Sequence, residues 1–209
     1  IEIVTTPAAG CCGAVSHHLD AHEEGLAFMR RNIDAWWPQI EAGAEAIVMT
    51  ASGCGAMLED YGHLLRDDPD YADKAARVSE LARDIGEILA DEPLEQLQVR
   101  PEGPVAFHAP CTLQHALQAH TTVELLLRRV GFELTPVTDP HLCCGSAGTY
   151  SILQKDLAQQ LKRNKLAALE AGDPQQIATA NIGCLAHLQS GTRRPVRHWI
   201  EVLDAACAA

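Results

Sequence analysis

The chain has 209 residues, of which 47% are hydrophobic, so it is long enough to bury a core without disulfide bonds. Its 16 Lys and Arg against 28 Asp and Glu give a formal net charge of −12, which argues against binding nucleic acid phosphates or anionic lipid through a basic surface. No apolar run approaches the ~20 residues of a membrane span. We therefore expect a cytoplasmic protein without a membrane span, with peripheral contact to the inner face of the membrane left open.

Short β-rich runs alternate with amphipathic helical periods along the chain. Runs bounded by Gly, Pro or Asp predict strands at 1–4, 46–50, 105–108, 132–137 and 176–180. Apolar residues at helical spacing predict helix faces made of Leu26, Met29, Ile33 and Trp37; of Val78, Leu81, Ile85, Ile88 and Leu89; and of Leu153, Leu157, Leu161, Leu166 and Leu169. This alternation predicts an α/β fold with a largely parallel sheet.

Six of the eight cysteines belong to one duplicated pattern. The two copies consist of Cys11-Cys12-Gly13 with Gly53-Cys54, and of Cys143-Cys144-Gly145 with Gly183-Cys184. A period of about 130 residues is too long for a solenoid repeat and predicts two similar halves. We expect the first half at residues 1–95 and the second at 104–209, each a small, mostly parallel sheet flanked by helices.

Cys111 has no counterpart in the first half of the sequence. It lies 32 positions before Cys143, so its counterpart would lie about 20 residues before Ile1. The sequence also opens inside an apolar, strand-like run. We therefore expect the chain to be part of a longer protein that carries another cysteine shortly upstream.

The cysteine pattern is typical of metal binding in a reducing compartment. Adjacent cysteines are poor disulfide partners because the ring that joins them is strained, and a chain of this size needs no disulfide bonds for stability. Cysteines of the second half follow predicted strands and precede helices: Cys111, Cys143, Cys144 and Cys184. Ligands of open α/β sheets bind at such carboxyl ends of strands, where helix N-termini direct N–H groups toward negative charge.

Four soft ligands from three loops suit either tetrahedral zinc or an iron–sulfur cluster. Structural zinc usually takes its ligands from compact Cys-x-x-Cys knuckles. Adjacent cysteines such as Cys143 and Cys144 do not easily occupy two corners of one tetrahedral ion, but they can reach two irons of a cluster. The pattern therefore favours an iron–sulfur cluster, and zinc or unligated thiols stay open as alternatives.

Three histidines are candidates for a supporting role. His187 lies three positions after Cys184, one helical turn on, where it could serve as an extra ligand or equally as a capping or surface residue. His108 and His115 flank Cys111, so they could donate hydrogen bonds to sulfur or simply pack.

The cysteine arrangement resembles the cysteine-rich CCG domain that occurs in heterodisulfide reductase and in several iron–sulfur subunits, among them those of anaerobic glycerol-3-phosphate oxidation, lactate utilisation and glycolate oxidase. Four further stretches look most like glycolate oxidase iron–sulfur subunits: residues 32–38, 50–56, 143–150 and 197–201. The resemblance covers essentially all 209 residues.

The resemblance implies a non-catalytic electron-transfer subunit of a 2-hydroxy-acid dehydrogenase complex. In such a complex, flavin-containing subunits oxidise glycolate to glyoxylate and the iron–sulfur subunit relays electrons toward a quinone or another acceptor. The family also implies a ferredoxin-like domain that precedes the CCG pair in the parent chain. Two other classes stay open: a heterodisulfide reductase-like thiol–disulfide enzyme, and an assembly scaffold stabilised by zinc.

The sequence departs from the heterodisulfide reductase pattern at one position of each repeat. That version ends each repeat in Cys-x-x-Cys, and its five cysteines hold a noncubane four-iron cluster. Here Met57 and His187 stand at the final position. The resemblance therefore implies an ordinary [4Fe-4S] cluster in preference to the noncubane form, with four ligands: Cys111, Cys143, Cys144 and Cys184. The first half offers a second, incomplete set of three ligands: Cys11, Cys12 and Cys54.

Overall fold

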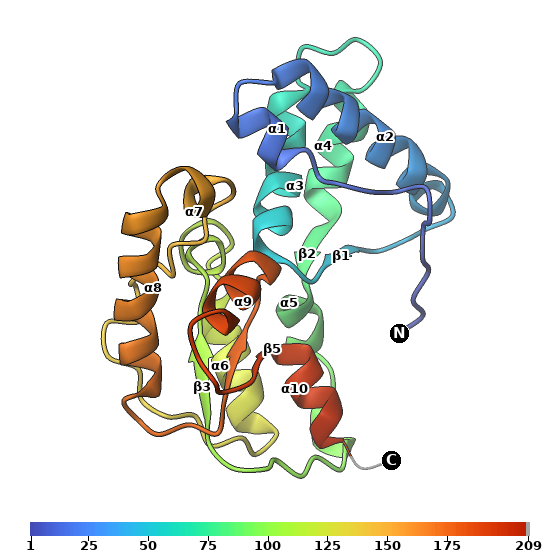
Figure 1. The fold of residues 1–209 in the computed structure, drawn as a ribbon. Coiled ribbons are helices and arrows are strands. Elements are labelled where there is room, and N and C mark those ends of the chain that lie inside the picture. The colour runs from blue at the N-terminus through green and yellow to red at the C-terminus, as the bar shows by residue number, and fades with distance from the viewer. Residues whose placement is uncertain (208–209) are drawn as a thin grey trace. The chain divides into compact units, whose positions relative to one another are not determined.

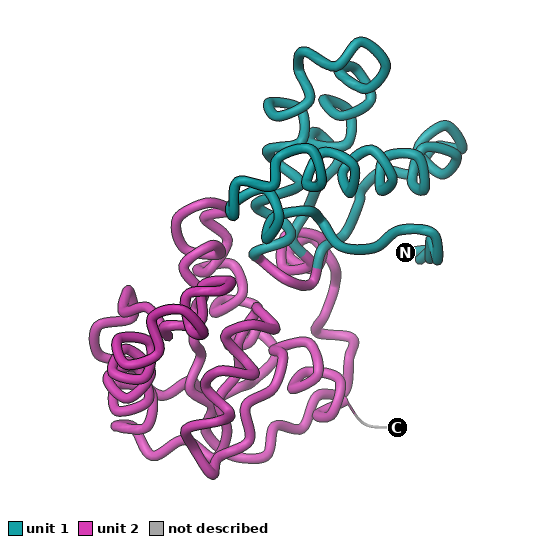
Figure 2. Tube along the Cα trace, turned by 45° about the horizontal axis from the view of Figure 1, so that its top comes forward, with its two compact units in different colours: residues 1–49, 53–84 teal, residues 50–52, 85–209 magenta. Residues whose placement is uncertain are grey.

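Two small sheets, both all-parallel, organise the chain (Figure 1). The computed structural model describes residues 1–207. It divides the chain into two compact units, the first made of residues 1–49 and 53–84 and the second of residues 50–52 and the chain from Ile85 onward (Figure 2). The expected α/β class with small parallel sheets is confirmed. The division into halves at 1–95 and 104–209 stays a prediction.

The helices and strands have the following bounds. In the first unit lie α1 (Ala14–His18), α2 (His22–Glu41), β1 (Ile47–Met49), α3 (Ser52–Leu64, from Gly53 onward), α4 (Ala72–Leu81) and β2 (Ala82–Asp84). In the second unit lie α5 (Ile85–Ala90), a 3₁₀ helix (Leu94–Gln96), β3 (Val105–His108), a π-helix (Thr112–Ala116), α6 (His120–Arg129), α7 (Tyr150–Leu153), α8 (Lys155–Glu170), β4 (Gln176–Thr179), α9 (Ile182–Gln189), β5 (Val196–His198) and α10 (Trp199–Ala206).

The core of the first unit forms between α2, α3 and α4. The predicted face of α2 is confirmed, since Met29 and Ile33 are fully buried and Leu26 and Trp37 pack against the same core. Tyr61 of α3 is also fully buried in this cluster. Burial of this apolar face, rather than helix propensity, is what stabilises such a helix in a folded protein.

Two predictions in the first unit are wrong. Residues 1–4 are exposed and form no strand, because they pair with no other strand among the described residues and a strand needs a ladder partner for its N–H and C=O groups. The apolar period from Val78 to Leu89 is not one helix. It is interrupted by β2, whose Ala82 pairs with Ile47 of β1 in parallel register.

The sheet of the second unit has the strand order β3-β4-β5, all parallel. The strands predicted at 105–108 and 176–180 are confirmed, whereas β5 was not predicted because its three residues are too few for a periodic signal. The strand predicted at 132–137 reduces to one parallel bridge between Leu134 and Val105. Pro136 lacks the N–H that a longer ladder would need.

Successive residues of β3 point to opposite faces of this sheet. Val105 and Phe107 pack in the cluster that includes Leu127 of α6 and Trp199 of α10. Ala106 lies in a different cluster, together with Leu166 of α8 and residues of α9. Helices therefore cover both faces of the sheet, as the buried strands of a parallel sheet require.

The buried face of α8 differs from the predicted leucine stripe. Leu153 and Leu157 are exposed, whereas Lys162 and Lys165 are buried together with Leu166. Apolar periodicity assigns lysine to the solvent face, because lysine is rarely buried without a partner. The predicted stripe is therefore wrong in its N-terminal part.

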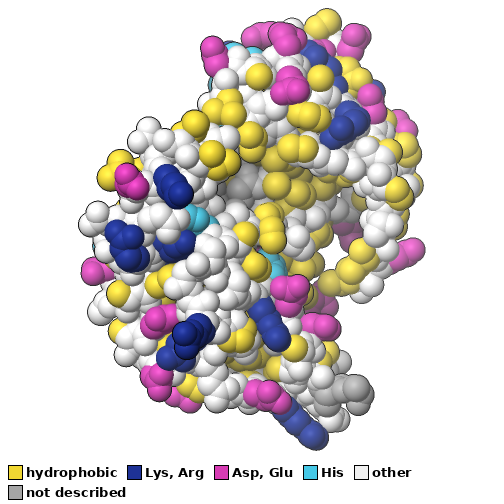
Figure 3. Space-filling view, in the orientation of Figure 1, with side chains coloured by type: hydrophobic (Ala, Val, Ile, Leu, Met, Phe, Trp, Pro, Cys, Tyr) yellow, Lys and Arg dark blue, Asp and Glu magenta, His cyan; other side chains and the backbone are white. Residues whose placement is uncertain are grey.

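No helix of residues 1–207 is both long and apolar enough to cross a membrane. On the face shown in Figure 3, basic and acidic side chains are interspersed, and the basic ones form no continuous patch there. This distribution agrees with the net charge of −12.

Candidate metal centre

Cys111 and His108 lie at the carboxyl end of β3 in the second unit. His108 is the last residue of the strand and is fully buried. It lies two residues after Ala106, so its side chain points to the same face of the sheet, which α8 and α9 cover. Cys111 immediately precedes the π-helix Thr112–Ala116. Both the carboxyl ends of parallel strands and π-helical turns are frequent places for functional groups.

The turn that carries Cys143 and Cys144 depends on Gly145. Gly145 has φ +86°, and a Cβ atom there would lie 2.5 Å from the carbonyl oxygen of Ala158, so only glycine lets this loop pass so close to α8. The Gly145 N–H donates to Cys143 Sγ at 3.3 Å. The turn therefore leaves Cys143 half-buried and directs Cys144 into the interior.

Cys184 lies in the first turn of α9. Asn181 caps this helix, since its Oδ1 accepts a hydrogen bond from the Gly183 N–H at 2.9 Å. The Sγ atoms of Cys144 and Cys184 are 3.2 Å apart, well beyond the ~2.05 Å of a disulfide bond. All eight cysteines of the chain are free thiols.

Hydrogen bonds between these four thiols lower the pKa values of two of them and raise those of the other two. The hydrogen bond from Cys111, with a further one from Cys144, lowers the pKa of Cys143 to about 2. The hydrogen bond from Cys144 lowers the pKa of Cys184 to about 5. Hydrogen bonding to Cys143, reinforced by burial, raises the pKa of both Cys111 and Cys144. The lowered pKa values of Cys143 and Cys184 favour the thiolate, the form that binds metal.

His108 completes this group from the sheet side. A ring nitrogen of His108 and the Sγ atoms of Cys144 and Cys184 lie within 4.8 Å of one another. The ring also contributes to the lowered pKa of Cys184, yet neither ring nitrogen has a hydrogen-bond partner of normal geometry within residues 1–207. A buried imidazole without partners is costly, and a thiolate-bound metal group would give it one.

The donor set fits a metal group bound by soft sulfur ligands. Four cysteines from three segments of the chain meet beside one face of the sheet, the pKa values of two of them are lowered, and the buried His108 has no hydrogen-bond partner of normal geometry in residues 1–207. By ligand type, this combination suits an iron–sulfur cluster or zinc. A four-cysteine cluster would use each Sγ atom once: those of Cys111, Cys143, Cys144 and Cys184.

Lys165 is a member of this site that sequence reasoning missed. It lies on α8, is fully buried, and its Nζ donates a 2.7 Å hydrogen bond to the carbonyl oxygen of Pro140. Burial lowers the pKa of Lys165, and all four cysteines of the site oppose that shift. The repeat could have indicated this position. A helix follows each Cys-Cys-Gly turn, so the two helices can be aligned from the turns, and the residues at matching positions can then be compared.

The other two candidate histidines, His115 and His187, are not in the group formed by His108, Cys144 and Cys184. His115 is exposed on the π-helix. His187 is half-buried on α9, and its Nε2 donates to the carbonyl oxygen of Ala158 at 3.4 Å. Their roles as ligands or as hydrogen-bond donors to sulfur stay predictions.

The first unit brings together Cys11, Cys12 and Cys54. The hydrogen bond from Cys54 lowers the pKa of Cys12 to about 6, and the same contact raises the pKa of Cys54. The turn repeats the geometry of Gly145: Gly13 has φ +87°, and a Cβ atom there would lie 2.7 Å from the carbonyl oxygen of Gly25 on α2.

A neutral network holds this turn in the first unit. Asn32 of α2 is fully buried; its Oδ1 accepts from the Gly10 N–H at 2.8 Å and its Nδ2 donates to the Cys11 carbonyl at 2.9 Å. The Tyr61 hydroxyl donates to the Cys12 carbonyl oxygen at 2.8 Å, and burial raises the pKa of Tyr61. The residues that fix the turn are therefore an amide and a phenol.

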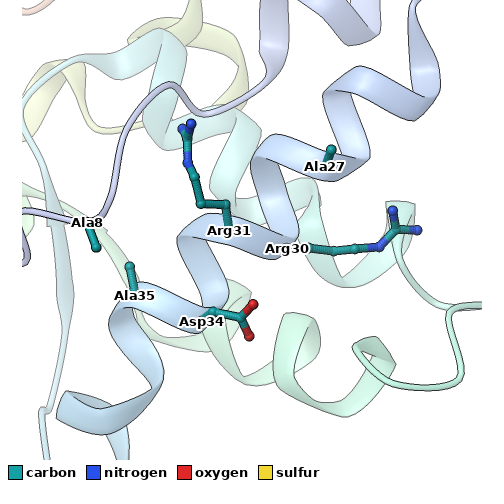
Figure 4. Close-up of a pocket in the computed structure, with 6 residues that line it drawn as sticks. All are labelled: Ala8, Ala27, Arg30, Arg31, Asp34 and Ala35. Atoms are coloured by element: carbon teal, nitrogen blue, oxygen red, sulfur yellow. The ribbon is translucent and has the colours of Figure 1, made fainter.

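A surface cavity of about 530 Å³ in the first unit is lined by Ala8, Ala27, Arg30, Arg31, Asp34 and Ala35. Figure 4 shows Arg30 and Arg31 leaving α2 in different directions. Arg30 is paired with Asp68 at 2.8 Å, and Asp34 accepts a hydrogen bond from the Tyr71 hydroxyl. No cysteine lines this cavity, and we do not assign a function to it.

Fold and site together define a duplicated α/β protein that gathers cysteine thiols behind Cys-Cys-Gly turns. The sequence model of the cysteine-rich (CCG) domain matches residues 1–59 and 105–189. The chain therefore belongs to the CCG cysteine-rich domain family, which confirms the resemblance seen in the sequence.

Curated relatives share this similarity over nearly the whole chain. The glycolate oxidase iron–sulfur subunit of Escherichia coli K12 is 59% identical over 206 residues, 99% of this chain and 51% of the relative. A probable glycolate oxidase iron–sulfur subunit of Bacillus subtilis 168 is 32% identical, over 92% of this chain and 44% of the relative. Lactate utilization protein A of Bacillus licheniformis is 28% identical, over 93% of this chain and 83% of the relative. The chain spans about half the length of the first two.

Proposed function

We propose that this chain is the cluster-binding region of an iron–sulfur subunit in a 2-hydroxy-acid oxidase or dehydrogenase complex of the glycolate type. The observation that carries the proposal is the meeting of Cys111, Cys143, Cys144 and Cys184 beside the buried His108, whose ring nitrogens have no hydrogen-bond partner of normal geometry in residues 1–207. The names of the relatives, glycolate oxidase iron–sulfur subunit and lactate utilization protein A, support the same reading.

The cluster we propose for the second unit is a [4Fe-4S] cluster with four cysteine ligands, Cys111, Cys143, Cys144 and Cys184. Adjacent Cys143 and Cys144 suit two irons of one cluster better than two corners of a single zinc ion. A five-thiolate noncubane form would need a cysteine where His187 stands, and the His187 ring is directed to a backbone carbonyl. His108 then donates to a thiolate sulfur, a contact of the kind that tunes the potential of a cluster.

Electron transfer, rather than oxidation of the acid itself, is the role that suits these residues. Conversion of a 2-hydroxy acid into a 2-oxo acid releases two electrons and two protons, formally a hydride and a proton, which a flavin can accept. We propose that partner subunits carry that flavin and that this region passes the electrons singly toward a quinone or a similar acceptor. A ferredoxin-like domain in the parent chain would share the relay.

The first unit supplies Cys11, Cys12 and Cys54 as ligands of a second centre in our proposal. Among residues 1–207, these are the three thiols that the first unit brings together. We further propose a cytoplasmic location with peripheral contact to the inner face of the membrane, where a quinone acceptor would be accessible.

The proposal is tested on anaerobically purified and reconstituted protein. Iron and acid-labile sulfide are counted per chain, zinc is measured in parallel, and an EPR spectrum is recorded before and after reduction with dithionite. Iron and sulfide in equal amounts, with a signal that changes on reduction, are expected. Stoichiometric zinc with a silent spectrum would support the scaffold alternative, and disulfide turnover by metal-free protein would support the thiol enzyme.

A further inference from the structure

One lysine of α8, Lys165, has no contact with solvent. Lys165 is 0% exposed, and its Nζ donates a hydrogen bond to the carbonyl oxygen of Pro140, three residues before Cys143. Transfer of an ammonium group out of water is costly unless an opposite charge compensates it. Lys165 makes none of the ion pairs found among the described residues, so carboxylates do not supply that compensation.

The opposite charge available to Lys165 is that of the cysteine sulfurs. All four cysteines of the site, Cys111, Cys143, Cys144 and Cys184, favour its charged form electrostatically. The neighbouring Leu166 packs in the same buried cluster as Cys144 and Cys184, so this part of α8 lies against the site. Burial lowers the pKa of Lys165 and these sulfurs oppose that shift, so they are the charges that can compensate the buried ammonium group.

The first unit has a neutral residue at the equivalent place. Gly145 passes against Ala158 of α8 just as Gly13 passes against Gly25 of α2. Seven residues after these contact points, two helical turns on, stand Lys165 and Asn32, both fully buried.

Both residues hold the cysteine turn of their own unit by hydrogen bonds to its backbone, Lys165 to the carbonyl of Pro140 and Asn32 to that of Cys11. An amide is sufficient for this structural task, as the first unit shows. The additional property of the lysine is its charge.

We propose that Lys165 is a positioning and charge-compensating residue of the four-cysteine site, which raises the reduction potential of the cluster bound there relative to a site with a neutral residue at this position. The inference rests on the proposed function. Four thiolate ligands are anionic, and each added electron increases the negative charge, so a nearby fixed cation stabilises the reduced form more than the oxidised form.

Three substitutions separate charge from structure. Lys165→Gln retains a donor for the Pro140 carbonyl but removes the charge, and Lys165→Arg retains the charge. Lys162→Gln is the matched control, because Lys162 is a second buried lysine of α8, whose Nζ donates instead to Ser190 Oγ at 2.7 Å. Circular dichroism of each protein checks folding, iron and sulfide are counted, and the midpoint potential is measured by an EPR-monitored redox titration.

We expect the Lys165→Gln cluster to be harder to reduce, with at least a tenfold lower ratio of reduced to oxidised cluster at the wild-type midpoint, which corresponds to about 59 mV for one electron. Lys165→Arg and Lys162→Gln should stay close to the wild type. If Lys165→Gln does not retain iron, retention by Lys165→Arg supports the proposal and loss in both variants overturns it.

An iron-loaded Lys165→Gln protein with the wild-type potential would also overturn the role of Lys165 while leaving the proposed function intact. Absence of iron from the wild-type protein would instead refute the proposed function, and this inference with it.

Discussion

The Sγ atoms of Cys144 and Cys184 lie 3.2 Å apart, although 40 residues separate these cysteines in the sequence. Their contact depends on two independent local features, the turn at Gly145 and the capped first turn of α9. Both cysteines pack in the same buried cluster on the face of the sheet that α8 and α9 cover. The site is therefore formed by tertiary packing and not by a short sequence motif.

Replacement of Cys144 by Ser should remove most of the metal from the second unit. Oxygen is a poor ligand for iron–sulfur clusters compared with thiolate, and Cys144 is the most deeply buried of the four sulfur ligands. The measurement is iron and sulfide per chain after anaerobic reconstitution. Cys207→Ser is the control, since Cys207 lies outside both cysteine groups, and it should match the wild type. Unchanged iron in Cys144→Ser would contradict the assignment.

The two cysteine groups should differ in how much iron they hold. The cysteine group of the second unit has four thiols and that of the first unit has three, so Cys54→Ser should lose less iron than Cys144→Ser in the same preparation. The expected loss for Cys54→Ser is less than half of that for Cys144→Ser. Equal losses would indicate that the first unit holds an equivalent centre.

Gly145→Ala should destabilise the metal-free protein by about 3 kcal/mol, from a left-handed backbone that costs ~1–2 kcal/mol for a non-glycine residue and from overpacking against Ala158. Gly148→Ala is the matched control. Gly148 also has a positive φ, +53°, but a Cβ atom there meets open space, so only the backbone cost of about 1–2 kcal/mol applies. Urea unfolding monitored by circular dichroism gives both values. Equal destabilisation would mean that the close approach to α8 is unimportant.

Acidification should weaken the second unit partly through His198. Its Nδ1 accepts from the Ile200 N–H at the start of α10, its Nε2 donates to the Thr50 carbonyl oxygen, and burial lowers its pKa. The unfolded state, with an ordinary pKa near 6.5, then binds more protons than the folded state, so stability falls as the pH decreases below about 6.5.

His198→Asn keeps a capping oxygen without a titrating group. The free energy of unfolding should therefore decrease less between about pH 7.5 and about pH 5.5 in this variant than in the wild type. The difference between the two decreases should stay within the ~1.4 kcal/mol per pH unit that one group can contribute. The same decrease in both proteins would show that His198 does not titrate as we expect.

The sequence predicted the class of fold and the cysteine groups because both depend on residues with strong and local signals. Strands at Val105–His108 and Gln176–Thr179 are short β-rich runs that are soon followed by cysteine-bearing segments. Cys-Cys-Gly turns repeat in both halves, so their glycines and sulfurs could be compared directly.

The errors arose where pairing or burial overrides local preference. Ala82–Asp84 would continue a helix by its period but instead pairs with β1. Residues 1–4 are mostly apolar but pair with no strand in residues 1–207. Lys165 was missed because a lysine is assigned to solvent unless its partners are known, and those partners come from distant loops.

Gly13 and Gly145 have φ angles that differ by one degree, +87° and +86°. The shape of each cysteine turn is therefore encoded in its backbone and does not depend on which polar side chain the following helix presents to it. Under the role we propose for Lys165, a single replacement at Asn32 or at Lys165 would therefore change the affinity of one centre for electrons while the backbone of its turn keeps its shape. An engineer who wished to adjust one centre without disturbing the other would begin at these same two positions.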